Sequence, residues 1–159
     1  MIFADKVILS ILLISNIFAI ELSIGQKAIK ELVLSESKKH TRYKSTIAAI
    51  CFTESSLGIN ILGDDKRSLG IAQMQVKTVR YISSKDNSLA YLNGYTDKRI
   101  ETMLLTNNRL AVELASKLFE YYRKRYGYFG AISRYNGGRK NYRYYKKVID
   151  NRKMLNGTK

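Results

Sequence analysis

The sequence KSTIAAICFTESSLG, residues 44–58, decides the fold class. Its apolar residues repeat with the period of an α-helix, and we expect a helix from Ser45, a suitable N-cap, to Leu57, with Gly58 ending it. Four residues spaced i, i+3, i+4 and i+7 share one face of this helix: Ile47, Ile50, Cys51 and Glu54. That face is apolar except for its last member, so a carboxylate stands where a core residue is expected.

Glu54 has two explanations at this stage. The helix end can fray near Gly58, so that Glu54 reaches water or pairs with one of the 28 Lys and Arg residues. Alternatively, burial keeps part of the carboxyl population protonated, as glycosidases do with their general acid. An unperturbed glutamate, with a pKa of about 4.3, is almost fully ionised at pH 7, so the second explanation requires a raised pKa.

The rest of the chain also favours helices. We expect a loop over residues 60–68 and a second helix over residues 70–82. A third helix should begin at Asp97, its N-cap. Further helices are expected over residues 110–127, over residues 130–135 and from about residue 141. No convincing alternating pattern of a β-strand is present, and no internal repeat. The sequence therefore predicts a single, mainly α domain over residues 44–150.

The two ends of the sequence are assigned separately. Residues 1–19 combine Lys6 with an apolar run too short to span a bilayer, which is typical of a signal peptide; an uncleaved N-terminal anchor is the alternative. We expect residues 20–43 to form a leading helix or tether, and residues 151–159 a basic tail. Either form of the N-terminal segment predicts a periplasmic or secreted protein, with inner-membrane association only if the segment is uncleaved.

The composition restricts the chemistry and the partner. With one cysteine and one histidine, Cys51 and His40, the chain has too few customary ligands for a zinc site and no suitable pair for thiol catalysis, so we expect no metal and no cofactor. The net charge of +15 favours a polyanionic partner. Cations interleaved with tyrosines after residue 120 fit single-stranded nucleic acid, cell-wall glycan or a solvated helix face. The export signal argues against nucleic acid.

Four short blocks in order carry a resemblance to a known family. They read ESSL at 54–57, GIAQM at 70–74, NRLA at 108–111 and RYNGG at 134–138. Each block alone is weak, but their order and spacing over residues 44–145 resemble the soluble lytic transglycosylase (SLT) domain of the lysozyme-like superfamily. The resemblance implies a mainly α (α+β lysozyme-like) fold with a glycan-binding groove.

The resemblance also implies a reaction and its residues. Glu54 would be the catalytic acid/base that cleaves the MurNAc–GlcNAc β-1,4 bond of peptidoglycan and leaves a 1,6-anhydromuramic end. Gln73 would bind the sugar, Tyr135 would hydrogen-bond near Glu54, and Asn136 would fix its loop and the substrate. Ser55, within the first block, is also expected in the substrate site.

Asp64 departs from the usual pattern and keeps alternatives open. A similarly placed Asp occurs in goose-type lysozymes, which are hydrolases, so Asp64 makes a hydrolysing muramidase the first rival; an Asp in such a loop is also a common turn residue. A non-catalytic peptidoglycan-binding protein is the second rival, and the retained Glu54 argues against it. The small size is similar to that of enzymes that open the wall for a secretion or surface-appendage system.

Overall fold

The computed structural model describes residues 21–157, so the predicted signal segment 1–19 lies outside the described residues. The elements, in chain order, are α2 (Ile24–Ser37), α3 (Lys44–Ser55), β1 (Leu62–Gly63), β2 (Ser68–Leu69), α4 (Val76–Ser83), η1 (Asn87–Gly94), α5 (Asp97–Thr106), α6 (Asn108–Tyr135) and α7 (Tyr142–Gly157). The mainly helical class expected from the sequence is confirmed.

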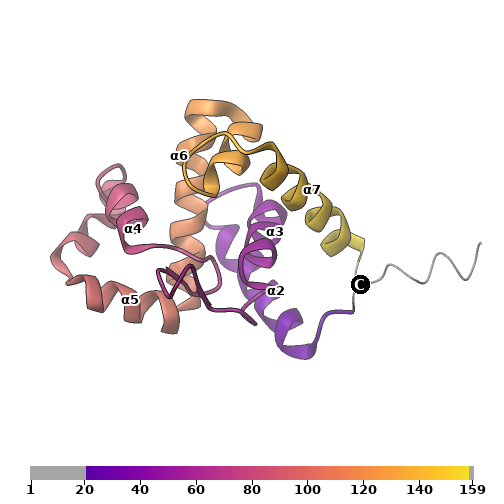
Figure 1. The fold of residues 1–159 in the computed structure, drawn as a ribbon, viewed down its shortest axis with the longest axis horizontal. Helices are drawn as coiled ribbons and strands as arrows, with labels where there is room; N and C mark the ends of the chain where they lie inside the picture. The colour runs from indigo at the N-terminus through magenta and orange to yellow at the C-terminus, as the bar shows by residue number, and fades with distance from the viewer. Residues whose placement is uncertain (1–20, 158–159) are drawn as a thin grey trace, which may run out of the picture.

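The long helix α6 runs between two groups of elements. In Figure 1, α4 and α5 lie on one side of α6, and α2, α3 and α7 lie on the other. Helix α3 packs against α2, α6 and α7, so it is surrounded by other helices. This arrangement places the end of α3 between the two groups.

The predicted helix around residue 50 is confirmed, with shifted ends. Ile47, Ile50 and Cys51 are fully buried, as their spacing requires. Helix α3 begins after Tyr43, which makes no side-chain cap, and not at a Ser45 cap. It ends at Ser55 because Ser56 and the next two residues take positive φ angles, which break the helical hydrogen-bond pattern.

The segment predicted as the first turn of the second helix is a buried turn instead. Helix α4 begins at Val76, and Gly70–Gln73 form the turn before it. Gly70 has φ +73°, and a Cβ on it would lie 2.1 Å from the carbonyl oxygen of Leu104 in α5. Only glycine fits this approach without displacing backbone, so the block GIAQM fixes a turn against α5.

A short antiparallel hairpin replaces the predicted loop. β1 pairs with β2 in the register Leu62↔Leu69 and Gly63↔Ser68, and Leu69 forms a further bridge to Met74. The turn between the strands contains Asp64, whose φ is +47°. Strands of two residues are too short to show alternation in the sequence, which is why the periodicity missed them.

The helices predicted at 110–127 and 130–135 are parts of one element, α6. Gly127 interrupts it with φ +68° and ψ −177°, values outside the helical region. The part of α6 after the kink carries Tyr135, whose hydroxyl donates to the carbonyl oxygen of Ala72. The cap of the preceding helix α5 is Thr96, which accepts a hydrogen bond from Arg99, and not Asp97.

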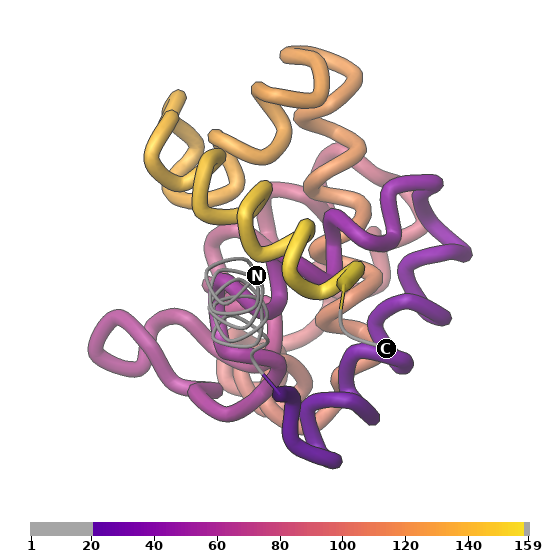
Figure 2. Tube along the Cα trace, turned by 90° about the vertical axis from the view of Figure 1, so that its right-hand side faces the viewer, coloured from indigo at the N-terminus to yellow at the C-terminus, as the bar shows by residue number. Residues whose placement is uncertain are grey.

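The two flanking segments pack as parts of the domain. In the leading segment, α2 starts at a capping box formed by Ser23 and Gln26, and Val33 is fully buried. Residues 151–157 continue α7 and are not a separate tail, since Leu155 is buried. Figure 2 shows α7, in yellow, running back toward α2, where Lys30 Nζ donates a hydrogen bond of 2.8 Å to the carbonyl oxygen of Leu155.

Candidate active site

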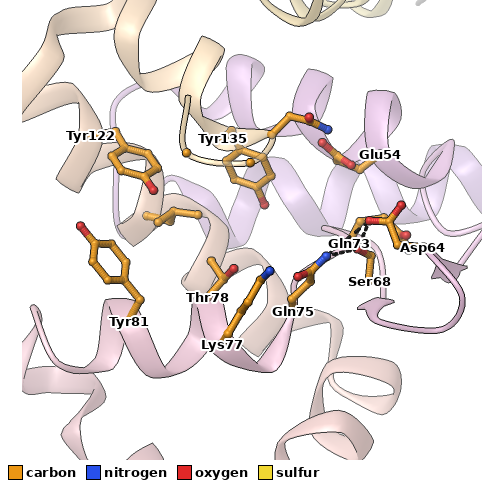
Figure 3. Close-up of a pocket in the computed structure, with 14 residues that line it drawn as sticks. Glu54, Asp64, Ser68, Gln73, Gln75, Lys77, Thr78, Tyr81, Tyr122 and Tyr135 are labelled. Carbon is orange, nitrogen blue, oxygen red and sulfur yellow. Dashed lines mark hydrogen bonds between the residues drawn. The ribbon is translucent and has the colours of Figure 1, made fainter. Parts of the chain in front are cut away.

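A cleft of about 470 Å³ opens beside the end of α3. Helix α4 forms one wall with its first turns, and the last turn of α3 and the side of α6 form the other (Figure 3). The lining residues are Glu54, Asp64, Ser68, Gln73, Gln75, Lys77, Thr78, Tyr81, Leu118, Tyr122, Tyr135, Asn136, Gly137 and Gly138. The cleft therefore combines one aliphatic and three aromatic side chains with amides, hydroxyls and charges, as ligand sites usually do.

Glu54 lies at this cleft on the core-facing stripe of α3, and its side chain is part-buried. The hydroxyl of Tyr144, from α7, donates a hydrogen bond of 2.5 Å to Glu54 Oε1. Helix α7 therefore supports the carboxyl group from behind, while the cleft leaves it accessible in front. Helix α3 ends one residue after Glu54, but the carboxyl group is held by Tyr144 and does not simply extend into water.

Burial raises the pKa of the Glu54 carboxyl above its usual value. The hydrogen bond from Tyr144 and the positive charge of Lys147 oppose this shift, and the negative charge of Asp64 adds to it. A carboxyl group with a raised pKa keeps a larger protonated fraction near neutral pH, which is the requirement for a general acid. The arrangement can donate a proton into the cleft.

Tyr135 also lines the cleft, near Glu54, where the resemblance placed it. Its hydroxyl donates to the carbonyl oxygen of Ala72 at 3.1 Å, and lies 3.4 Å from the sulfur of Met74. Tyr135 thus joins α6 to the turn before α4, and Tyr144 makes the bond to Glu54. Burial raises the pKa of both phenols, so both stay neutral donors.

Asp64 faces the cleft from the hairpin turn. Its Oδ2 accepts a hydrogen bond of 2.7 Å from the Ser68 hydroxyl and a longer one of 3.4 Å from the Gln75 amide. Asp64 itself is exposed. These bonds hold the carboxylate to its own hairpin, although its charge still acts on Glu54.

Gln73 lines the cleft with a constrained side chain. Its Nε2 donates to the carbonyl oxygens of Asn60, at 3.1 Å, and Gly70, at 3.0 Å. Its Oε1 lies so close to Gly63 that a Cβ there would be 2.2 Å away. The amide therefore ties the segment before β1 to the turn before α4, and both of its protons are occupied within the protein.

Ser55 does not line the cleft, contrary to the sequence-based expectation. Its side chain is buried, and its hydroxyl lies 2.7 Å from the carbonyl oxygen of Ile71 and 3.1 Å from that of Cys51. It also accepts a hydrogen bond from the backbone N–H of Gly58. Ser55 holds the end of α3 against the buried turn and so supports Glu54 from within the core.

The block at 134–138 forms the rim of the cleft. Asn136, exposed, and the two glycines after it line the cleft, and both glycines have positive φ angles. The Arg134 guanidinium donates a hydrogen bond of 2.9 Å to the carbonyl oxygen of Gly138, which fixes the loop. Asn136 is placed where its amide can contact a ligand.

Sequence reasoning missed Tyr144 and the α4 wall. Tyr144 shares the buried face of α7 with Val148 and Leu155. A polar group on an apolar helix face marks a candidate site residue, and this criterion, which singled out Glu54, could also have found Tyr144. The wall residues Gln75 and Tyr81 gave no such signal, because polar residues on a surface helix are ordinary.

Residues 21–157 contain no group of three or more His, Cys, Asp or Glu side chains that could hold a metal ion. Burial raises the pKa of the Cys51 thiol to about 12, so it stays protonated and unreactive. Within the same residues, none of the helices has the length and apolar character needed to cross a membrane.

The comparisons with known proteins agree with the motif blocks. The family model described as Transglycosylase SLT domain matches residues 31–156, which include α3, the hairpin, α6 and nearly all of α7. No curated protein and no solved structure gives a match. A family match over most of the chain, together with Glu54 at the cleft, establishes that this chain belongs to the transglycosylase SLT domain family.

Proposed function

We propose that this protein is a peptidoglycan lytic transglycosylase and that Glu54 is its acid and base. The observation that carries the proposal is a part-buried carboxyl group with a raised pKa, held by Tyr144 at the edge of a polar cleft. Family membership supports glycan cleavage as the reaction.

In the proposed reaction, protonated Glu54 donates its proton to the glycosidic oxygen between MurNAc and GlcNAc. The bond from muramic C1 to that oxygen breaks, and the leaving sugar keeps the proton as a hydroxyl group. The Glu54 carboxylate then takes the proton of the muramic 6-hydroxyl, whose oxygen bonds to C1. The product has a 1,6-anhydro end, Glu54 is protonated again, and no water is consumed.

The cleft contains two carboxylates, of which the proposed steps use one. Of the fourteen lining residues, two are acids, Glu54 and Asp64. Asp64 is exposed to solvent, and its Oδ2 accepts a hydrogen bond from Ser68 within its own hairpin. An attacking hydroxyl of the same sugar removes the need for a second carboxylate, because its position is set by the sugar ring.

The walls of the cleft fit a glycan that carries acidic peptides. Thr78 and Asn136 present polar groups for sugar hydroxyls, and the ammonium group of Lys77 can meet peptide carboxylates. The net charge of +15 attracts an anionic polymer over a longer range. We propose that residues 1–19 direct the protein outside the inner membrane, where peptidoglycan lies. Service to a secretion or appendage system stays a prediction from the sequence.

A hydrolysing muramidase is the second candidate, because Asp64 lines the same cleft as Glu54. A hydrolase uses a second carboxylate to activate water, and its products end in a reducing sugar. Mass spectrometry of muropeptides released from purified sacculi separates the two reactions. We expect 1,6-anhydro ends, and reducing ends from the unmodified protein would replace the transglycosylase with the muramidase.

The role of Glu54 is tested by Glu54→Gln, which keeps the shape and the acceptor for Tyr144 but has no acidic proton. We expect release of muropeptides to fall by about a hundredfold or more, the usual worth of general acid catalysis. Binding to sacculi should persist. Activity above about a hundredth of wild type would show that another group supplies the proton.

A further inference from the structure

Two tyrosines join the walls of the cleft away from the catalytic acid. The hydroxyl of Tyr81, on α4, donates a hydrogen bond of 2.9 Å to the hydroxyl of Tyr121, on α6. Their rings meet edge to face, with centroids 5.5 Å apart and planes at 89°. This Tyr81–Tyr121 bridge connects segments 40 residues apart in the sequence.

The bridge lies at one end of the cleft. Figure 3 shows Tyr81 and Tyr122 at the end opposite to Glu54 and Asp64, projecting from the two walls toward each other. Tyr122 packs on Tyr121 with ring centroids 5.7 Å apart, and its hydroxyl lies beside the rim glycine Gly138. The α4 wall, the α6 wall and the rim therefore meet at this end.

Several contacts keep the bridge closed. The guanidinium of Arg125 stacks over the Tyr121 ring at 4.6 Å, and the ammonium of Lys85 lies 5.9 Å from the centre of the Tyr81 ring. The hydrogen bond to Tyr121 raises the pKa of Tyr81 to about 12, so the bridging proton remains in place at any physiological pH. The two tyrosines of the bridge and the cations of Arg125 and Lys85 therefore pack together.

We infer that the Tyr81–Tyr121 bridge closes one end of the cleft, so that the enzyme holds glycan strands by a chain end and releases short fragments. This inference rests on the proposed function for the nature of the substrate. A strand that lies across Glu54 runs along the cleft and meets the bridge on one side. The strand can extend freely only on the other side of Glu54. The distance from Glu54 to the bridge therefore limits the length of the released fragment.

The side chain of Tyr81 can be removed with little damage to the core, since it is 39% exposed. In Tyr81→Ala the end of the cleft opens, and strands can pass through. On sacculi at low conversion, wild type should release short fragments from the first time point. Tyr81→Ala should raise the ratio of long to short fragments about tenfold, which corresponds to removing a steric barrier of about 1.4 kcal/mol.

Tyr91→Ala is the matched control. Tyr91 is 52% exposed and also pairs edge to face with a tyrosine, Tyr95, but it does not line the cleft. This variant should keep the wild-type distribution of fragment lengths. Equal distributions in Tyr81→Ala and wild type, or long internal fragments from wild type at the start of digestion, would overturn the closed end.

A binding measurement tests the closed end without catalysis. Inactive Glu54→Gln should saturate glycan strands at a stoichiometry that follows the number of chain ends and is independent of strand length. Stoichiometry that rises with strand length would overturn the inference, whether or not Tyr81→Ala folds. The chemistry of the new ends decides the proposed function separately: short fragments with reducing ends would refute the transglycosylase and retain the closed cleft.

Discussion

The hydroxyl of Tyr144 lies 2.5 Å from Oε1 of Glu54, across 90 residues of sequence. This contact and the burial of Glu54 act on the pKa of the acid in opposite directions: burial disfavours the carboxylate, and the donated hydrogen bond stabilises it. The balance leaves the pKa of Glu54 raised. The same carboxyl can therefore be an acid in one step and, once ionised, an oriented base in the next.

Tyr144→Phe should move the pH profile of cleavage. Without the hydroxyl, the carboxylate loses a stabilising donor, so the pKa of Glu54 rises further. The rate of a general acid falls as pH rises through its pKa, so this descending limb of kcat/KM should shift to higher pH on short soluble glycans. Tyr145→Phe is the control, since its ring packs on Phe129, 4.7 Å away, and not on Glu54. An unmoved limb in Tyr144→Phe would contradict this account.

Glu54→Gln should stabilise the fold at neutral pH. The folded-state pKa of Glu54 is raised above that of the unfolded chain, so the stability it contributes is complete below the unfolded value, about 4.3, and is lost as pH rises through the folded value. Glutamine has no charge to bury. In urea titrations, the free energy of unfolding should be higher for Glu54→Gln than for wild type at pH 7. The two proteins should have the same free energy of unfolding near pH 4. A variant less stable than wild type at pH 7 would be inconsistent with a raised pKa of Glu54 in the folded protein.

Asp64→Asn should leave most of the activity and the 1,6-anhydro ends unchanged. The amide keeps an acceptor for Ser68 but cannot act as a base, and a catalytic base is worth about a hundredfold or more. A loss of activity smaller than about tenfold would therefore show that Asp64 is not the catalytic base. Collapse of activity in this variant, with reducing ends from wild type, would identify Asp64 as the base of a hydrolase.

Gly70→Ala should destabilise the domain by more than about 1 kcal/mol, because the new methyl group meets the carbonyl oxygen of Leu104 and φ is positive. Gly94→Ala is the control, since a Cβ there has no other atom within 4 Å. The midpoint of urea unfolding should fall for Gly70→Ala and stay nearly unchanged for Gly94→Ala. Equal midpoints would mean that the turn can move away from α5.

The helical periodicity predicted α3 and the exceptional position of Glu54, because a face of a helix follows from spacing alone. It failed at Gly70–Gln73, where Ile71 and Ala72 are buried as in a helix but belong to a turn. A burial pattern of a few residues does not distinguish the two structures when the backbone packs against another element.

The partners of the site residues were harder to predict. Spacing assigns Tyr144 to the buried face of α7 but does not say which helix that face meets. The same holds for the bond between Tyr81 and Tyr121, which depends on the packing of α4 against α6. Ser55 was expected in the substrate site but is buried outside the cleft, whereas Tyr135 lines it. The partners of both hydroxyls, Ala72 and Ile71 in the turn before α4, could not be read from the sequence.

The order of synthesis gives the contact between α3 and α7 another meaning. Glu54 precedes Tyr144 by 90 residues, so the donor of its hydrogen bond is synthesised well after the acid itself. A nascent or truncated chain that lacks α7 therefore carries the acid without its donor and without the burial that α7 provides. The proposed acid therefore gains its hydrogen-bond donor only when α7 packs against α3.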